Sequence, residues 1–92
     1  MILLELYKDE TSLFLLGARE GFKSYGTYQI EIELEYRGEK RTFKTLTNDM
    51  QLIDEAKEIE DSDEKAEYLY KGVKSSIDSA IGEWIMDVDD EN

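Results

Sequence analysis

The strongest constraint on the fold is a strict alternation of apolar and polar residues from Tyr28 to Tyr36. The apolar set is Tyr28, Ile30, Ile32, Leu34 and Tyr36. The polar set between them is Gln29, Glu31, Glu33 and Glu35. Successive side chains of a strand point to opposite faces, so a period of two predicts a β-strand with one buried face.

This strand is predicted to form a hairpin with the segment 41–47 through a two-residue turn at Gly38-Glu39. The turn implies two cross-strand pairs, Leu34 with Phe43 and Glu33 with Lys44. Between the second strand and residue 28 lies Gly17–Gly26, a segment with three glycines and two aromatic residues. We expect it to be a connecting loop, either with its aromatic rings on the core or acting as a small recognition loop.

The N-terminal residues predict a second hairpin, with strands over 2–8 and 12–17 and a tight turn at Asp9-Glu10. The expected pairs are Leu6 with Leu13 and Leu4 with Leu15. Its other face is also apolar, with Leu3, Tyr7, Phe14 and Leu16. A sheet face open to water normally carries polar residues. This hairpin is therefore either covered on both sides or uses the second face to form a homodimer.

Residues after position 47 change to helical spacing. Asn48 or Asp49 is expected to cap a first helix, and Asn48 with Gln51 has the form of a capping box. Ser62 is the expected cap of a second helix, whose apolar stripe runs to Trp84. Strands followed by helices predict an α+β fold: an antiparallel sheet of about four strands in two hairpins, with two C-terminal helices packed on one face. We expect one domain over 1–86 and a disordered acidic tail over 87–92.

Composition argues against catalysis and dedicated metal binding. The 92 residues include no histidine and no cysteine, so the usual general base and thiol nucleophile are missing. The acids Asp61 and Asp63 do not begin a calcium loop, because the sixth position is Ala66 instead of the required glycine. No phosphate-binding glycine motif is present. We therefore expect no enzyme, no cofactor and no metal site.

The acidic charge is concentrated in the second half of the chain. Residues 1–47 contain 8 acidic and 7 basic residues, whereas residues 48–92 contain 15 acidic and 4 basic residues, which gives a net charge of −12. This field opposes direct nucleic-acid binding, which needs lysine and arginine on phosphates. The charge promotes solubility, and it also suits a basic protein partner.

A glutamate column on the alternating strand has a spacing of about 6.8 Å, close to that of phosphates along a nucleic-acid strand. An exposed Tyr68 among the helical acids would add an aromatic contact. The candidate partner-binding residues are Glu31, Glu33, Glu35, Asp54, Glu55, Glu58, Asp61, Asp63, Glu64, Glu67 and Tyr68. A simple solvated face is the alternative for all of them.

Two functional hypotheses follow. The first is a non-enzymatic acidic interaction domain that binds a basic, nucleic-acid-binding protein, as DNA mimics and phage inhibitors of similar size and charge do. The second is a structural domain that forms a homodimer through the N-terminal hairpin. The sequence has no apolar run long enough for a membrane span and no evident signal peptide, so a cytoplasmic location is expected.

Overall fold

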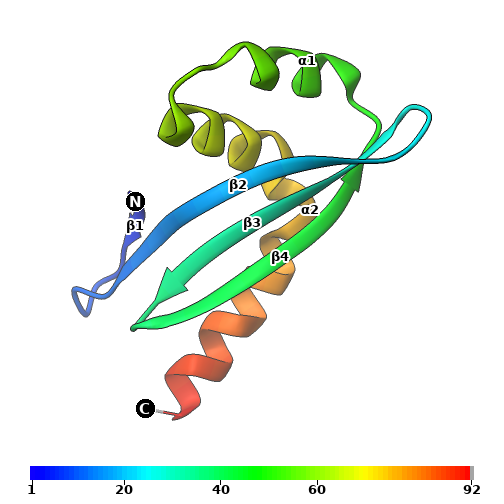
Figure 1. Cartoon of the computed structure of the whole chain (residues 1–92). Helices are drawn as coiled ribbons and strands as arrows, with labels where there is room; N and C mark the ends of the chain where they lie inside the picture. The colour runs from blue at the N-terminus through cyan, green and yellow to red at the C-terminus, as the bar shows by residue number, and fades with distance from the viewer. Residues whose placement is uncertain (92) are drawn as a thin grey trace.

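The computed structural model describes residues 1–91 and has two layers, an antiparallel sheet and a pair of helices on one side of it (Figure 1). The strand order is β1-β2-β3-β4, so each strand pairs with its neighbour in the chain. This α+β arrangement confirms the predicted fold class. The elements are β1 (Ile2–Leu6), β2 (Ser12–Ser24), β3 (Thr27–Tyr36), β4 (Glu39–Thr47), α1 (Met50–Glu58) and α2 (Ser62–Glu91).

The core lies between the inner face of the sheet and α2. Ile30, Ile32 and Leu34 of β3 are fully buried there, as the alternation predicts. Trp84 of α2 closes the other end of the core through edge contacts with the rings of Tyr36 and Phe43. The glutamates between the buried residues therefore lie on the outer face, which neither helix covers.

The predicted loop over Gly17–Gly26 is wrong, because β2 continues to Ser24 and only Tyr25 and Gly26 form the turn. A bulge between Leu15 and Gly17 shifts the alternation by one residue. After the bulge Ala18 pairs with Ile32 on the inner face, and Arg19 pairs with Glu31 on the outer face. The two hairpins are thus joined into one continuous meander.

The predicted register of the N-terminal hairpin is also wrong. Leu6 pairs with Ser12 and Ile2 with Leu15, because the turn is a longer loop and a bulge separates Leu3 from Glu5. The loop is closed by the Tyr7 amide, which donates to the Thr11 carbonyl at 2.9 Å. The bulge reverses the expected faces of the last residues, so Leu6 lies on the outer face and Tyr7 packs against the core.

The hairpin of β3 and β4 turns one residue earlier than predicted, at Arg37-Gly38. Both residues have positive φ, +52° and +80°, as a two-residue hairpin turn of this type requires. The register moves by two positions, so the predicted pairs of Leu34 with Phe43 and Glu33 with Lys44 are wrong. Phe43 pairs with Ile32, and Lys44 pairs with Glu31.

The cap of the first helix is one of the two predicted residues, whereas the cap of the second lies one residue before the predicted one. Asp49 caps α1, and its carboxylate accepts from the Leu52 amide at 3.1 Å, so no capping box forms with Asn48. At α2, the carboxylate of Asp61 instead of Ser62 accepts from the amides of Asp63 and Glu64. In both cases the negative charge of an aspartate, which Asn48 and Ser62 lack, meets the positive end of the helix.

The acidic segment expected as a disordered tail belongs to α2 as far as Glu91. Val88 is buried one helical turn after Trp84, which extends the apolar stripe. Residue 92, the end of the predicted tail, lies outside the described residues. Among the helices of residues 1–91, none is both long and apolar enough to cross a membrane.

Candidate interaction surfaces

The glutamate column is on the outer face of the sheet, and the charge of its most buried member, Glu31, is compensated. Glu31 has only 19% of its side chain exposed and accepts from Arg19 Nε at 2.5 Å. The Lys44 ammonium lies 3.8 Å from the same carboxylate. These contacts, led by the hydrogen bond from Arg19, hold the pKa of Glu31 below its ordinary value.

The other two glutamates of the column differ in their neighbours. Glu35 lies opposite Lys40 of β4, whereas Glu33 lies between Gly17 and Thr42, which carry no charge. The column therefore has three basic neighbours: Arg19 and Lys44 at Glu31, and Lys40 opposite Glu35. The column does not form a free anionic row like a phosphate backbone. The sequence-based hypothesis missed Arg19 because its segment was expected to be a loop.

The helical acids are on the opposite side of the sheet from the column. Inner residues of β3 alternate with the glutamates and pack against α2, so the sheet separates the two groups. The predicted partner-binding residues therefore form two surfaces instead of one. We call the exposed acids of α1, the link and the first turns of α2 the helical acidic surface, which consists of Asp54, Glu58, Glu60, Asp61, Asp63 and Glu64.

The helical acidic surface is weakly neutralised because nearby lysines are engaged elsewhere. Lys65 reaches Glu20 of β2, with 3.0 Å between Nζ and Oε1. Lys57 lies over the ring of Tyr28 at 5.0 Å from its centroid. Within residues 1–91 the only ion pair of this surface joins the Met1 amino group to Asp63, at 3.8 Å. Glu60 belongs to this surface and was not among the predicted residues.

Tyr68 and its neighbours are not part of the free acidic surface. The prediction that Tyr68 is exposed is wrong, because the residue is half-buried against the core between α1 and α2. Its hydroxyl donates to the carboxylate of Glu55. Glu67 forms an ion pair with Lys71 at 2.8 Å, one helical turn away. Tyr68 and Glu55 therefore join the two helices, whereas the ion pair of Glu67 lies within α2.

The predicted dimer face is changed by one member. Leu3 pairs with Phe14 on the outer side of the sheet, and Leu3 is 54% exposed. Tyr7 does not belong to this face, because its ring meets that of Tyr36 edge-on at 5.8 Å. Leu6 takes its place and is 62% exposed. Phe14 and Leu16 are half-buried, and together these four form what we call the outer apolar patch: Leu3, Leu6, Phe14 and Leu16.

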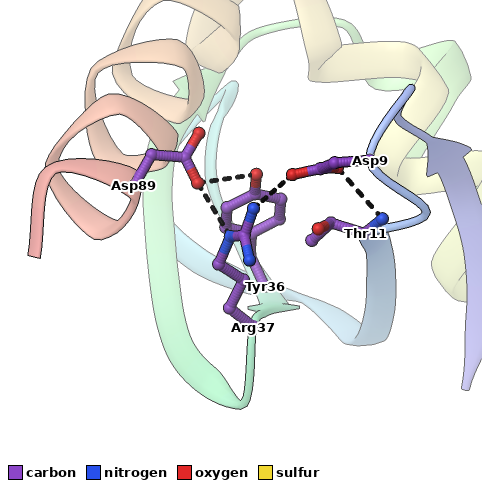
Figure 2. Close-up of polar contacts among 5 residues, drawn as sticks. All are labelled: Asp9, Thr11, Tyr36, Arg37 and Asp89. Atoms are coloured by element: carbon purple, nitrogen blue, oxygen red, sulfur yellow. Dashed lines mark hydrogen bonds and ion pairs between the residues drawn. The ribbon is translucent and has the colours of Figure 1, made fainter. Parts of the chain in front are cut away.

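The densest polar cluster joins the two short loops to the end of α2 (Figure 2). Tyr36 donates its hydroxyl proton to Asp89 Oδ1 at 2.9 Å, and Arg37 Nε donates to the same oxygen at 2.8 Å. Arg37 also donates from Nη2 to Asp9. The bond to Asp89 raises the pKa of the Arg37 guanidinium, and the bonds from Thr11 lower the pKa of Asp9. Both pKa shifts favour the charged forms of Arg37 and Asp9, which suits a structural contact and not acid–base chemistry.

No group of three or more potential metal ligands occurs among the residues that the structure describes. No family model matches the chain, and neither a curated protein nor a solved structure matches it. The surfaces described above are therefore the basis for assigning a function.

Proposed function

We propose that this chain is a non-enzymatic interaction domain that binds a basic, nucleic-acid-binding protein through the helical acidic surface. The observation that carries the proposal is the exposed set of acids around α1 and the link, whose neighbouring lysines contact other elements. A basic partner would supply the missing counter-charges. Such complementarity mainly speeds association and selects partners by the sign of their surface.

The position of the bases favours the helical acidic surface, and not the glutamate column, as the part that would imitate nucleic acid. In the glutamate column, Glu31 has a base on each side and Glu35 lies opposite Lys40, so the column is a poor imitation of phosphates. The helical acidic surface has few such bases, and it is the surface that we expect to enter a cationic groove. Its charges are exposed and hydrated, so binding should weaken steeply as salt screens them.

The test compares two triple variants with the same change in charge. Asp54→Lys, Glu58→Lys and Glu60→Lys reverse the helical acidic surface. Glu33→Lys, Glu35→Lys and Glu39→Lys make the same change in charge on strands β3 and β4 and serve as the control. Purified chain is immobilised at low salt, and the basic nucleic-acid-binding proteins retained from a cell lysate are identified and their affinities measured.

We expect the wild type and the sheet variant to retain the same basic protein and the helical variant to lose it. Association should slow by about tenfold or more when salt rises from low to physiological concentration. Retention of no basic protein by the wild type would contradict the proposal. Equal loss in both triple variants would contradict the assignment to the helical side.

A homodimer through the outer apolar patch is a second candidate, supported by the exposure of Leu3 and Leu6 beside Phe14. Sedimentation at micromolar concentration tests it, since a dimer would have twice the 10.7 kDa of the chain. Leu6→Asp should dissociate the dimer without unfolding the domain, because Leu6 is already exposed. A wild-type chain that sediments as a monomer contradicts this candidate.

A further inference from the structure

The two sides of β2 are unequally paired over its distal half. On one side β3 pairs with β2 along its length, from Leu13 to Ser24. On the other side β1 pairs only with residues 12–15. From Leu16 to Ser24, no other strand of residues 1–91 lies along this side. We call this stretch the open edge of β2.

The turn geometry identifies which main-chain groups the open edge presents. The pair Tyr36–Glu39 closes a two-residue turn and is therefore hydrogen-bonded, so even-numbered residues of β3 face β4 and odd-numbered ones face β2. The partners of the even-numbered residues must then turn their N–H and C=O groups away from β3. These partners are Ala18, Glu20 and Phe22.

The open edge lacks a protection that the opposite edge of the sheet has. On β4, Arg41 is on the inner side of the strand opposite Leu34, and it forms no ion pair among residues 1–91. Charged side chains of this kind discourage the addition of a further strand. On β2 the inner-side charge is Glu20, and Lys65 neutralises it at 3.0 Å. The edge of β2 is therefore the better acceptor of a strand.

The side chains along the open edge indicate the chemistry of its occupant. On the outer side lie Arg19, which is 80% exposed, and Lys23. On the inner side lies Phe22, which is 69% exposed. On its paired side the same strand already meets alternating partners, Glu31 opposite Arg19 and Tyr28 opposite Phe22. A second strand with alternating acidic and apolar residues would repeat these contacts.

We propose that the open edge of β2 binds an extended segment of another protein, in which acidic residues alternate with apolar ones. The segment adds as a fifth strand, with main-chain hydrogen bonds to Ala18, Glu20 and Phe22. Its acidic side chains lie beside Arg19 and Lys23. This site is separate from the helical acidic surface and does not depend on the proposed function.

The probe is a labelled ten-residue peptide that copies Thr27–Tyr36, the natural neighbour of β2 on its other side. Binding is measured by fluorescence anisotropy at physiological salt, where the Debye length is about 8 Å and only charges near the edge matter. Amide hydrogen exchange of the full chain locates the contact. We expect the peptide to protect the amides of Ala18, Glu20 and Phe22 from exchange. A variant peptide with lysine in place of each glutamate should bind about tenfold more weakly.

Two proline variants test the main-chain contact. Ala18→Pro removes an N–H of the open edge, and Thr42→Pro removes an N–H that faces solvent on β4. We expect about fivefold weaker binding in the first variant and unchanged binding in the second, since one main-chain hydrogen bond contributes about 1 kcal/mol. If Ala18→Pro does not fold, the exchange protection of the open-edge amides in the wild type tests the main-chain contact instead.

Three outcomes would overturn the proposal. The first is no binding by the wild type, and the second is protection of β4 amides in place of those of β2. The third is a wild-type dimer that protects the amides of the open edge without peptide, since the occupant would then be a second copy of this chain. Equal binding of a peptide with the same composition in scrambled order would also count against alternation as the recognised feature.

Discussion

Arg37 is the residue that connects the most distant parts of the chain. It has a φ of +52°, a conformation that non-glycine residues rarely adopt. From this turn its guanidinium reaches Asp9 in the first loop and Asp89 in the last turns of α2 (Figure 2). The contacts of Arg37 therefore offset the strain of its turn, and they attach the end of α2 to the sheet.

Asp89→Ala should loosen the C-terminal turns of α2. Tyr36 and Arg37 both lose their acceptor, and the hydroxyl of Tyr36 belongs to a buried residue. We expect the free energy of unfolding to fall by about 1–2 kcal/mol. Urea unfolding measures the loss, and amide exchange should show faster opening after Trp84.

Asp90→Ala is the matched control, because the side chain of Asp90 is exposed and makes no hydrogen bond or ion pair among residues 1–91. It should leave the stability unchanged within about 0.5 kcal/mol. Equal losses in the two variants would show that the cluster around Arg37 does not stabilise the end of the helix.

Sequence reasoning identified the strand at 28–36 and the helical stripe because each repeats one period over many residues. It failed where a single residue changes the period. The bulge after Leu15 shifts the alternation, and the glycines and charges that follow then resemble a loop. The hydrogen bonds of Asp89 join residues more than 50 positions apart, which no local pattern predicts. Val88 was within reach, since it continues the spacing of Trp84 by four residues.

The candidate surfaces were predicted less completely than the fold. The acids of the helical surface are exposed, as charged residues in a helical face should be. Their separation from the glutamate column and the neutralisation of Glu31 by Arg19 depend on which strands are neighbours. Strand order and register are set by bulges and turns, so charges on different strands could not be combined from the sequence.

At the level of elements, the two glycines of α2 have different roles. A Cβ at Gly72 would lie 2.5 Å from a methyl carbon of Leu52 in α1, whereas a Cβ at Gly82 would meet no atom within 4 Å. Gly72 therefore allows the close approach of α1 and α2. Gly82 only reduces the helical propensity of its segment.

Gly82→Ala should stabilise the chain by about 0.5–1 kcal/mol, because alanine favours the helix and nothing opposes its methyl group. Gly72→Ala has the same intrinsic gain, but Leu52 is buried and must move. We expect no net gain or a loss. Thermal unfolding of both variants tests the contrast. A gain at Gly72 as large as that at Gly82 would contradict close packing between the helices.

The end of α2 is electrostatically unfavourable for a helix. Its last turn has no basic residue, and Asp90 and Glu91 are exposed at the negative end of the helix dipole. Replacing both with lysine should stabilise the chain by about 0.5–2 kcal/mol at low salt, and the gain should shrink as salt rises. Urea unfolding at two salt concentrations measures it. The same double change at Asp78 and Glu83, which are exposed in the interior of α2, is the control for reduced net charge alone.

At the level of the whole molecule, three tyrosines report how burial and negative charge act together. They come from separate elements: Tyr7 from the first loop, Tyr36 from β3 and Tyr70 from α2. Burial is the main cause of a raised pKa at each of them. Nearby carboxylates add to the effect, with Glu5 beside Tyr7, Asp89 beside Tyr36 and Asp78 beside Tyr70. The pKa of Tyr7 rises from 10.0 to about 12.

These shifts predict a loss of stability in alkali. A tyrosine with a raised pKa in the folded state favours folding fully below its ordinary pKa of 10.0, and that contribution disappears as pH rises to about 12. Tyr7→Phe removes one ionising group, so its free energy of unfolding should fall less between about pH 9 and about pH 11 than that of the wild type. Tyr25→Phe is the control, because Tyr25 is fully exposed. Parallel curves for wild type and Tyr7→Phe would mean that Tyr7 ionises as easily in the folded chain as in the unfolded one, and that its burial does not link folding to pH.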